Sequence, residues 1–437
     1  MRRALTTLLL IGPLAALLSA CADGSGNSTS ESNPLATAPR LGTGSVVVRV
    51  VDTAGDPVPG AWTSVEDRTG TVRAESVDAD GYATFGDIWE GSAQLNANAW
   101  GYYDAGIRTS VADNGTTREL VTLERRNATT AAVLGTRAVS KSADGRTLVL
   151  ETDIAVLDES GQPLLGLTDA LFTMPGYDCG WGLCINGPDG SEIGSWLPVT
   201  GTPDAFGLVP ASSRRAYAAG LLVDQGRIVA ERQADPFRVN AIVEFLGNVT
   251  GTDSVALAEF SERSPESVLQ THGDFVSDGR LLLDAARGLG DRVGGSSPVV
   301  PAMQDMLGFM ASQSPAAAPT LVLISDQWLE APDRLVLAIA SRTAHTPIVT
   351  IAGHEAAAEL AVRAGGIFVN IDFPAQYHTA LRGLDSMLSV DLPFYRMRFS
   401  ITIDYAAALT PEATLFTAVR IQVSERDLLY VPVVLPL

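Results

Sequence analysis

The sequence predicts a multidomain protein that combines all-β regions with one α/β region, and three observations support this. Residues 45–215 contain short strands of alternating polarity, separated by regular turns. Residues 216–390 contain continuous apolar strands that alternate with amphipathic helices, which is typical of a parallel sheet covered on both faces. Alternating strands return in residues 391–437. At roughly 150 residues a domain, the 437 residues correspond to about three domains.

Residues 1–20 predict a lipoprotein signal peptide. Two arginines precede an apolar run from Ala4 to Leu18, and the small residues Ser19 and Ala20 come directly before Cys21. The run is shorter than the roughly 20 residues that a membrane-spanning helix needs. We therefore expect cleavage before Cys21 and a lipid on that cysteine, with an ordinary secretory signal as the alternative.

Residues 21–44 are rich in Gly, Ser, Asn, Thr and Pro, so they predict a flexible tether. The expected location is the cell envelope. Ala22 resembles the outer-membrane sorting pattern of some bacteria with two membranes, which favours the outer membrane in such a cell. The expected partners are this membrane, through the N-terminal lipid, and an unidentified protein ligand. Nucleic acid is not expected, because a net charge of -20 repels phosphate backbones.

Cys179 and Cys184 are the remaining cysteines and lie in the segment Cys-Gly-Trp-Gly-Leu-Cys. An exported chain meets an oxidising compartment, so we expect these two residues to form a disulfide that closes a small loop. A metal-binding pair is the alternative, but no histidine lies nearby in the sequence to complete such a site.

Residues 45–126 are expected to form a small β-sandwich, because turns such as Asp52-Thr53-Ala54-Gly55 and Asp78-Ala79-Asp80-Gly81 separate its strands. This pattern resembles the carboxypeptidase regulatory-like domain, a family without catalytic residues of its own. Asp78 and Asp80 also suggest half a calcium loop, but a turn is the better interpretation. Three tryptophans form either a sugar-stacking face or parts of the core and edges: Trp62, Trp89 and Trp100.

Residues 127–215 contain a strong strand, Leu148 to Leu157, and then a turn of the same kind, Asp158-Glu159-Ser160-Gly161. This stretch resembles the immunoglobulin-like sandwich that precedes von Willebrand A domains in some bacterial surface proteins. The strands of residues 391–437 are too few for a separate domain, so we expect them to complete this sandwich. The α/β region is then an insertion within the sandwich. A sandwich tolerates such an insertion because the two ends of an inserted domain usually lie close together.

Residues 216–390 resemble the von Willebrand factor A family. The matching segments are the strand that ends in Asp224, then Asp253-x-Val255-Ala256-Leu257, Gly294-Gly295-Ser296-Ser297-Pro298 and Ser325-Asp326. The resemblance implies a Rossmann-like parallel sheet. It also implies a metal-ion-dependent adhesion site at the C-terminal edge of the sheet, where open α/β sheets generally bind ligands.

The implied adhesion site uses an Asp-x-Ser-x-Ser motif, a threonine and a second aspartate. Asp224, Ser297 and Asp326 match one acid, the threonine and the other acid, whereas Gly226 and Ile228 replace the two serines. Mg²⁺ prefers about six oxygen ligands, so this site is degenerate and no cofactor is expected. The alternative is Mg²⁺ or Ca²⁺ held by the three matching residues.

A further hypothesis concerns the positive charge at the same place. Arg227 replaces the cation through charge-assisted hydrogen bonds to the acids, and the ligand-binding crest then consists of Asp224, Arg227, Ser297 and Asp326. The structural alternative is that the two acids only cap neighbouring loops and helix starts.

These observations favour a non-enzymatic, lipid-anchored protein that mediates adhesion or protein–protein interaction. No Gly-x-Ser-x-Gly, phosphate-loop or His-Glu-x-x-His motif occurs in the sequence. Two alternatives stay open: a structural or assembly scaffold with a vestigial metal site, and an accessory subunit of a catalytic partner. An open crevice with an apolar rim around Asp224 and Asp326 would favour ligand binding, and an occluded one would favour the scaffold.

Overall fold

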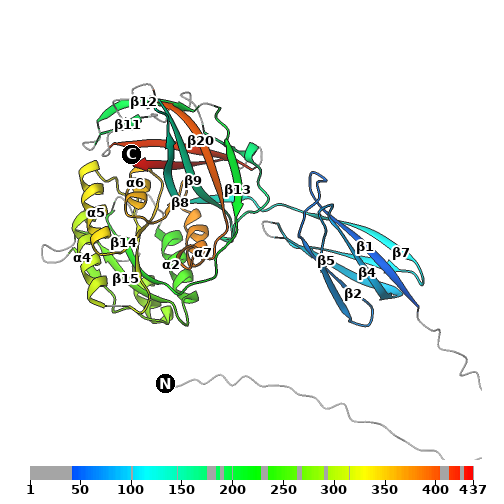
Figure 1. The fold of residues 1–437 in the computed structure, drawn as a ribbon. Coiled ribbons are helices and arrows are strands. Elements are labelled where there is room, and N and C mark those ends of the chain that lie inside the picture. Colours follow the sequence, from blue (N-terminus) through cyan, green and yellow to red (C-terminus); the bar gives the residue numbers. More distant parts are fainter. Residues whose placement is uncertain are drawn as a thin grey trace, which may run out of the picture.

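The computed structural model describes most of the chain after residue 41. The described residues are 42–99, 102–144, 146–174, 184–187, 191–198, 200–227, 235–262, 268–289, 294–313, 315–403, 413–423 and 428–436. A first β region, coloured blue to cyan in Figure 1, is followed by a larger body that contains the helices. In this part of the chain, no helix is long and apolar enough to cross a membrane. Cys21 and Cys179 lie outside the described residues, and Cys184 is the first residue of a short strand.

The first β region consists of two sheets that share one core. Its strands are β1 (Thr43–Asp52), β2 (Trp62–Glu66), β3 (Val72–Ser76), β4 (Tyr82–Trp89), β5 (Gly91–Asn98), β6 (Ala105–Val111) and β7 (Thr116–Leu123). The sheets have the orders β4-β1-β7 and β3-β2-β5-β6. Val46 and Val48 of the first sheet pack in one cluster with Val65 and Leu95 of the second. The alternating pattern therefore marks strands with one face on the core.

The structure bears on two expectations for this region, the end of the tether and the placement of the tryptophans. Strand β1 begins at Thr43, inside the range expected for the tether. Trp62 lies in β2 and Trp89 at the end of β4, so these two tryptophans belong to different sheets, while Trp100 lies outside the described residues.

The repeated Asp-x-x-Gly sequences form turns that the aspartate stabilises. In one of them, Asp78 Oδ1 accepts hydrogen bonds from the backbone N–H groups of Asp80 at 3.0 Å and Tyr82 at 2.8 Å. Gly81 has φ of 83°, a conformation that glycine adopts without strain. Asp158 makes the same pair of bonds to Ser160 and Gln162. These carboxylates serve the backbone, as expected for turn residues.

The α/β part of the larger body is a sheet with the order β16-β15-β14-β17-β18-β19. Its strands are β14 (Ala218–Asp224), β15 (Ser254–Phe260), β16 (Leu269–Thr271), β17 (Pro319–Ile324), β18 (Ile348–Ala352) and β19 (Phe368–Asn370). All neighbouring pairs are parallel except β15 with β16. This is the doubly wound order in which consecutive strands run outward from the first strand in both directions.

Helices cover both faces of this sheet. They are α2 (Asp235–Asn248), α3 (Leu283–Arg287), α4 (Val299–Gln313), α5 (Ala331–Thr343), α6 (Glu355–Arg363) and α7 (Gln376–Leu388), with a short 3-10 turn, η3 (Gly279–Leu282), before α3. One core contains Ile242 of α2 and Leu384 of α7, and a second contains Met303 of α4 and Leu337 of α5. Figure 1 shows these two helix layers on opposite sides of β14 and β15. Every residue of β14 is buried, which explains its continuous apolar sequence.

The remaining strands extend the same sheet. They are β8 (Ala128–Lys141), β9 (Thr147–Asp158), β10 (Phe172–Thr173), β11 (Cys184–Asn186), β12 (Glu192–Pro198), β13 (Ala205–Val209), β20 (Phe394–Ile403), β21 (Thr414–Gln422) and β22 (Leu428–Pro436). A second 3-10 turn, η1 (Asp169–Leu171), lies between β9 and β10 in this β-rich part. β19 pairs antiparallel with β8, where Phe368 faces Val133. β20 pairs with β9, β12 and β13, whereas β21 pairs with β10, β11 and β22. The C-terminal strands thus pair with strands that precede the α/β segment, and one hydrogen-bonded sheet crosses from the α/β part into the β-rich part.

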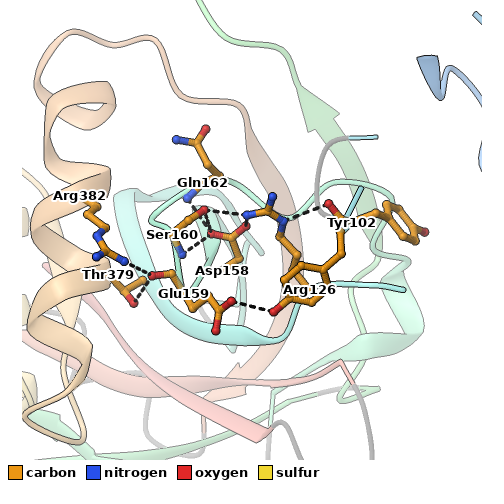
Figure 2. A network of polar contacts seen from close by, with 9 residues as sticks. Tyr102, Arg126, Asp158, Glu159, Ser160, Gln162, Thr379 and Arg382 are labelled. Carbon is orange, nitrogen blue, oxygen red and sulfur yellow. Dashed lines mark hydrogen bonds and ion pairs between the residues drawn. The ribbon is translucent and has the colours of Figure 1, made fainter. Parts of the chain in front are cut away.

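A polar network joins the first β region to the larger body (Figure 2). Arg126 donates to the Tyr102 carbonyl oxygen at 3.0 Å, to Asp158 at 3.2 Å and to Ser160 at 3.0 Å. Glu159, which lies between Asp158 and Ser160 in the turn after β9, accepts a hydrogen bond from the Tyr103 hydroxyl at 2.7 Å. Its carbonyl oxygen also accepts from Thr379 and Arg382 of α7. The turn after β9 therefore contacts both the first β region and α7.

Candidate functional site

The candidate site is the edge of the sheet where the parallel strands end, which we call the crest. Asp224 is the last residue of β14, and Asp326 lies two residues beyond the end of β17. Gly353 follows β18, and Ile371 follows β19. Because the carboxyl ends of parallel strands meet at one edge, these residues gather at the place where open α/β sheets bind ligands.

Asp224 lies buried at the centre of the crest and is surrounded by donors. Its Oδ1 atom accepts the Gly226 N–H at 2.7 Å and the Ser297 hydroxyl at 2.8 Å, and its Oδ2 atom accepts the Ser325 hydroxyl at 2.6 Å. Burial raises the pKa of Asp224 above its usual value, although these three hydrogen bonds oppose the rise. The structure therefore brings Asp224 and Ser297 into direct contact, and it adds Ser325, which directly precedes Asp326.

Two arginines lie near Asp224 in different ways. Arg227 has an exposed side chain, and its backbone N–H donates to the carbonyl oxygens of Gly294 and Gly295, each at 3.1 Å. Arg238 of α2 is fully buried and donates from Nη1 to the Asp224 carbonyl oxygen at 2.5 Å. The buried positive charge beside Asp224 is thus Arg238 and not Arg227.

The residues at Asp224 do not fit an octahedral divalent cation well. Gly226 has no side-chain oxygen, and a Cβ atom built on it would lie 1.9 Å from Ser297 Oγ and 3.0 Å from Asp224 Oδ1. Ser297 therefore occupies the space that a serine at position 226 would need. Both carboxylate oxygens of Asp224 already accept hydrogen bonds, whereas Mg²⁺ requires near-ideal geometry from about six oxygens. No group of three or more His, Cys, Asp or Glu suited to a metal occurs among the described residues.

Asp326 lies at the outer side of the crest and is associated with a histidine and a tryptophan. Its Oδ1 atom accepts the Gly353 N–H at 3.1 Å and lies 3.9 Å from His354 Nε2. His354 Nδ1 accepts the Ala357 N–H at 3.2 Å and so caps α6, which leaves Nε2 as the protonated nitrogen. Burial lowers the pKa of His354, although Asp326 opposes this effect. The Trp328 ring lies 5.5 Å from the imidazole ring and remains 47% exposed.

A small pocket of about 60 Å³ opens beside Asp326. Its lining residues follow the ends of β17, β18 and β19, and they include the loop between β19 and α7 and the first turn of α7: Asp326, Gly353, Ile371, Asp372, Phe373, Pro374 and Tyr377. Phe373 is 68% exposed, whereas Tyr377 is only 1% exposed. Sequence reasoning did not identify this pocket, because nothing in the local pattern links the start of α7 to Asp326. The signal that was present is the acidic Asp372, two residues after the end of the buried strand β19.

No protein-family model and no curated protein matches this chain. The solved structures to which this chain is similar include the following three. The first is an aerotolerance-related membrane protein from Bacteroides fragilis, with 11% identity, 40% of this chain and 98% of that chain covered, and a TM-score of 0.32.

The second is a von Willebrand factor type A protein from Catenulispora acidiphila, with 12% identity, coverage of 53% and 74%, and a TM-score of 0.33. The third is the ArnB paralog VWA2 from Sulfolobus acidocaldarius, with 11% identity, coverage of 70% and 75%, and a TM-score of 0.30. All three TM-scores lie below 0.5.

Proposed function

We propose that this chain is a lipid-anchored envelope protein that binds a protein partner at the crest of its α/β region. The observation that supports this proposal most is the open pocket beside Asp326, with Phe373 and Trp328 exposed near it. Large exposed aromatic side chains are enriched where proteins bind one another. The pocket is smaller than the roughly 300–1,000 Å³ that small-molecule sites occupy, so it suits one inserted side chain better than a metabolite.

The proposal extends to the architecture of the whole chain. We infer that the α/β region is a von Willebrand A-type domain whose adhesion site has lost its metal, because the strand order agrees with a doubly wound sheet and two motif serines are replaced. We further propose that the first β region is carboxypeptidase regulatory-like and that the β-rich part around β9 and β20 is immunoglobulin-like. Both are stalk elements in this proposal, and neither carries a catalytic role.

A scaffold function is the second candidate, and one observation favours it. Asp224 is fully buried and its carboxylate is bonded to neighbouring groups, so the centre of the crest is occluded. The crest has an open pocket only on the side of Asp326, as far as the described residues show. The two candidates therefore differ in whether the exposed residues on that side are needed for partner binding.

Affinity capture from envelope extract, with the mature chain as bait, tests the proposal. Phe373→Ser is expected to remove the captured partner. Leu281→Ser is the matched control, because Leu281 is 72% exposed and lies in η3, away from the pocket lining. Capture that survives Phe373→Ser and Trp328→Ala together would support the scaffold. A separate Cys21→Ala variant is expected to leave the membrane fraction, which checks the anchor.

A further inference from the structure

We propose that the pocket beside Asp326 receives the cationic end of a lysine or arginine side chain from a protein partner. This inference rests on the proposed function, since it names the chemistry by which the crest holds its partner. Three features of the pocket support it: a tyrosine hydroxyl group that makes no hydrogen bond within the described residues, two carboxylates, and an apolar wall that includes an exposed phenylalanine.

The buried hydroxyl group belongs to Tyr377. This residue is 1% exposed and lines the pocket. Its backbone N–H bonds to the Pro374 carbonyl oxygen, but within the described residues its hydroxyl makes no hydrogen bond. Since Tyr377 lines the pocket, a ligand there can supply the hydrogen-bond partner that this hydroxyl does not find among the described residues. Burial raises the pKa of Tyr377, which keeps the hydroxyl neutral and able both to donate and to accept.

The two carboxylates are Asp326 and Asp372. Asp326 accepts one N–H from Gly353 at 3.1 Å, and Asp372 accepts one N–H from the Asn370 amide at 3.2 Å. A carboxylate offers about four acceptor positions, so most of them remain for a ligand with several N–H groups. An ammonium or guanidinium group supplies three to five such donors together with the opposite charge.

The described residues that line the pocket include no positively charged side chain. Arg238 is fully buried with its Nη1 atom on the Asp224 carbonyl oxygen. The neighbouring His354 lies 3.9 Å from Asp326 through Nε2 but is not part of the pocket lining. The net charge of the chain is -20, and it adds a long-range attraction for basic partners.

The apolar wall suits the stem of a long basic side chain. Ile371, Phe373 and Pro374 line the pocket with the carboxylates. Lysine and arginine lay their methylene stems along apolar surface while the charged end reaches polar groups. The exposed Phe373 ring can also contact the cation through its face. With about 60 Å³ of space, the pocket accommodates the end of one side chain.

Binding of model amino acids to the mature chain tests this inference, followed by ligand-observed NMR. The probes are the Nα-acetyl amides of lysine, arginine, norleucine and glutamate, the last with and without Mg²⁺. Norleucine has the stem of lysine without the ammonium group. We expect the lysine or arginine probe to bind with a Kd of about 1 mM and the norleucine probe at least about tenfold more weakly. Equal binding of norleucine, or preferred binding of glutamate with Mg²⁺, overturns the inference.

Two variants locate the binding in the pocket. Tyr377→Phe removes only the hydroxyl, and Asp372→Asn removes one charge from an exposed residue. Each is expected to weaken binding of the basic probe at least about fivefold. Asp284→Asn is the control, because that side chain is fully exposed on α3. A purely structural Tyr377 predicts unchanged binding and equal or greater stability in Tyr377→Phe, and that result refutes the inference.

Failure of this inference is distinguishable from failure of the proposed function. Treating the envelope extract with an acetylating reagent neutralises lysines, and phenylglyoxal blocks arginines. If both treatments leave the capture intact while Phe373→Ser still abolishes it, the crest binds a partner by other chemistry. If Phe373→Ser leaves capture intact, the proposed function fails, whatever the model amino acids do.

Discussion

Replacing Gly226 by serine tests how the crest is built. The substitution restores the residue type of the adhesion motif, but a Cβ atom at this position lies 1.9 Å from Ser297 Oγ and 3.0 Å from Asp224 Oδ1. Ser297 must therefore move and give up its 2.8 Å hydrogen bond to the buried carboxyl group. A hydrogen bond to a charged group contributes about 1.5–3 kcal/mol, and overpacking adds about 1–3 kcal/mol.

We expect Gly226→Ser to lower the free energy of unfolding by about 3 kcal/mol or more. For a region of this size, 3 kcal/mol corresponds to a fall of about 6–12 °C in Tm. Thermal unfolding of the mature chain, followed by circular dichroism, measures the change. Gly247→Ser is the matched control, because nothing lies within 4 Å of a Cβ atom at this position of α2. The reasoning is refuted if both variants unfold at the same temperature.

Three further predictions follow from named contacts. Arg126→Ala removes the hydrogen bonds to Tyr102, Asp158 and Ser160, so small-angle scattering should show a wider range of orientations of the first β region. Arg108→Ala, at an exposed position, is the control and should leave the range of orientations unchanged. The Arg382 guanidinium and His378 lower the pKa of Glu244, so this contribution to stability is present above pH about 4.5 and is lost as pH falls below it. Glu244→Gln should flatten that part of the stability curve by less than about 1 kcal/mol, since the pair is partly exposed; an unchanged curve contradicts the assignment. Calorimetric titration with Mg²⁺, Ca²⁺ or Mn²⁺ should give no binding heat at the crest, and heat that Asp326→Ala abolishes would show that the site does hold a metal.

Sequence patterns were sufficient for the local elements and for part of the site. A strand buried on both faces must be apolar along its whole length, so β14 and β17 are recognisable without any neighbour. The end of a parallel strand must lie at the ligand-binding edge, so Asp224 and Asp326 could be assigned to one crest. Asp-x-x-Gly turns are equally local, because the carboxylate bonds to backbone two and four residues onward.

The tertiary structure alone decided which distant groups satisfy one another. Ser325 reaches Asp224 across 101 positions, and β20 pairs with β9 across more than 200, and no periodicity records such pairings. The joining of β19 to β8 into one sheet also depends on a match between two exposed strand edges. In the sequence, Asp224, Ser297 and Asp326 suggested a metal site that has lost two of its ligands. Only the packing showed that Ser297 fills that space and that the open, acidic pocket lies beside Asp326, where α7 supplies Tyr377.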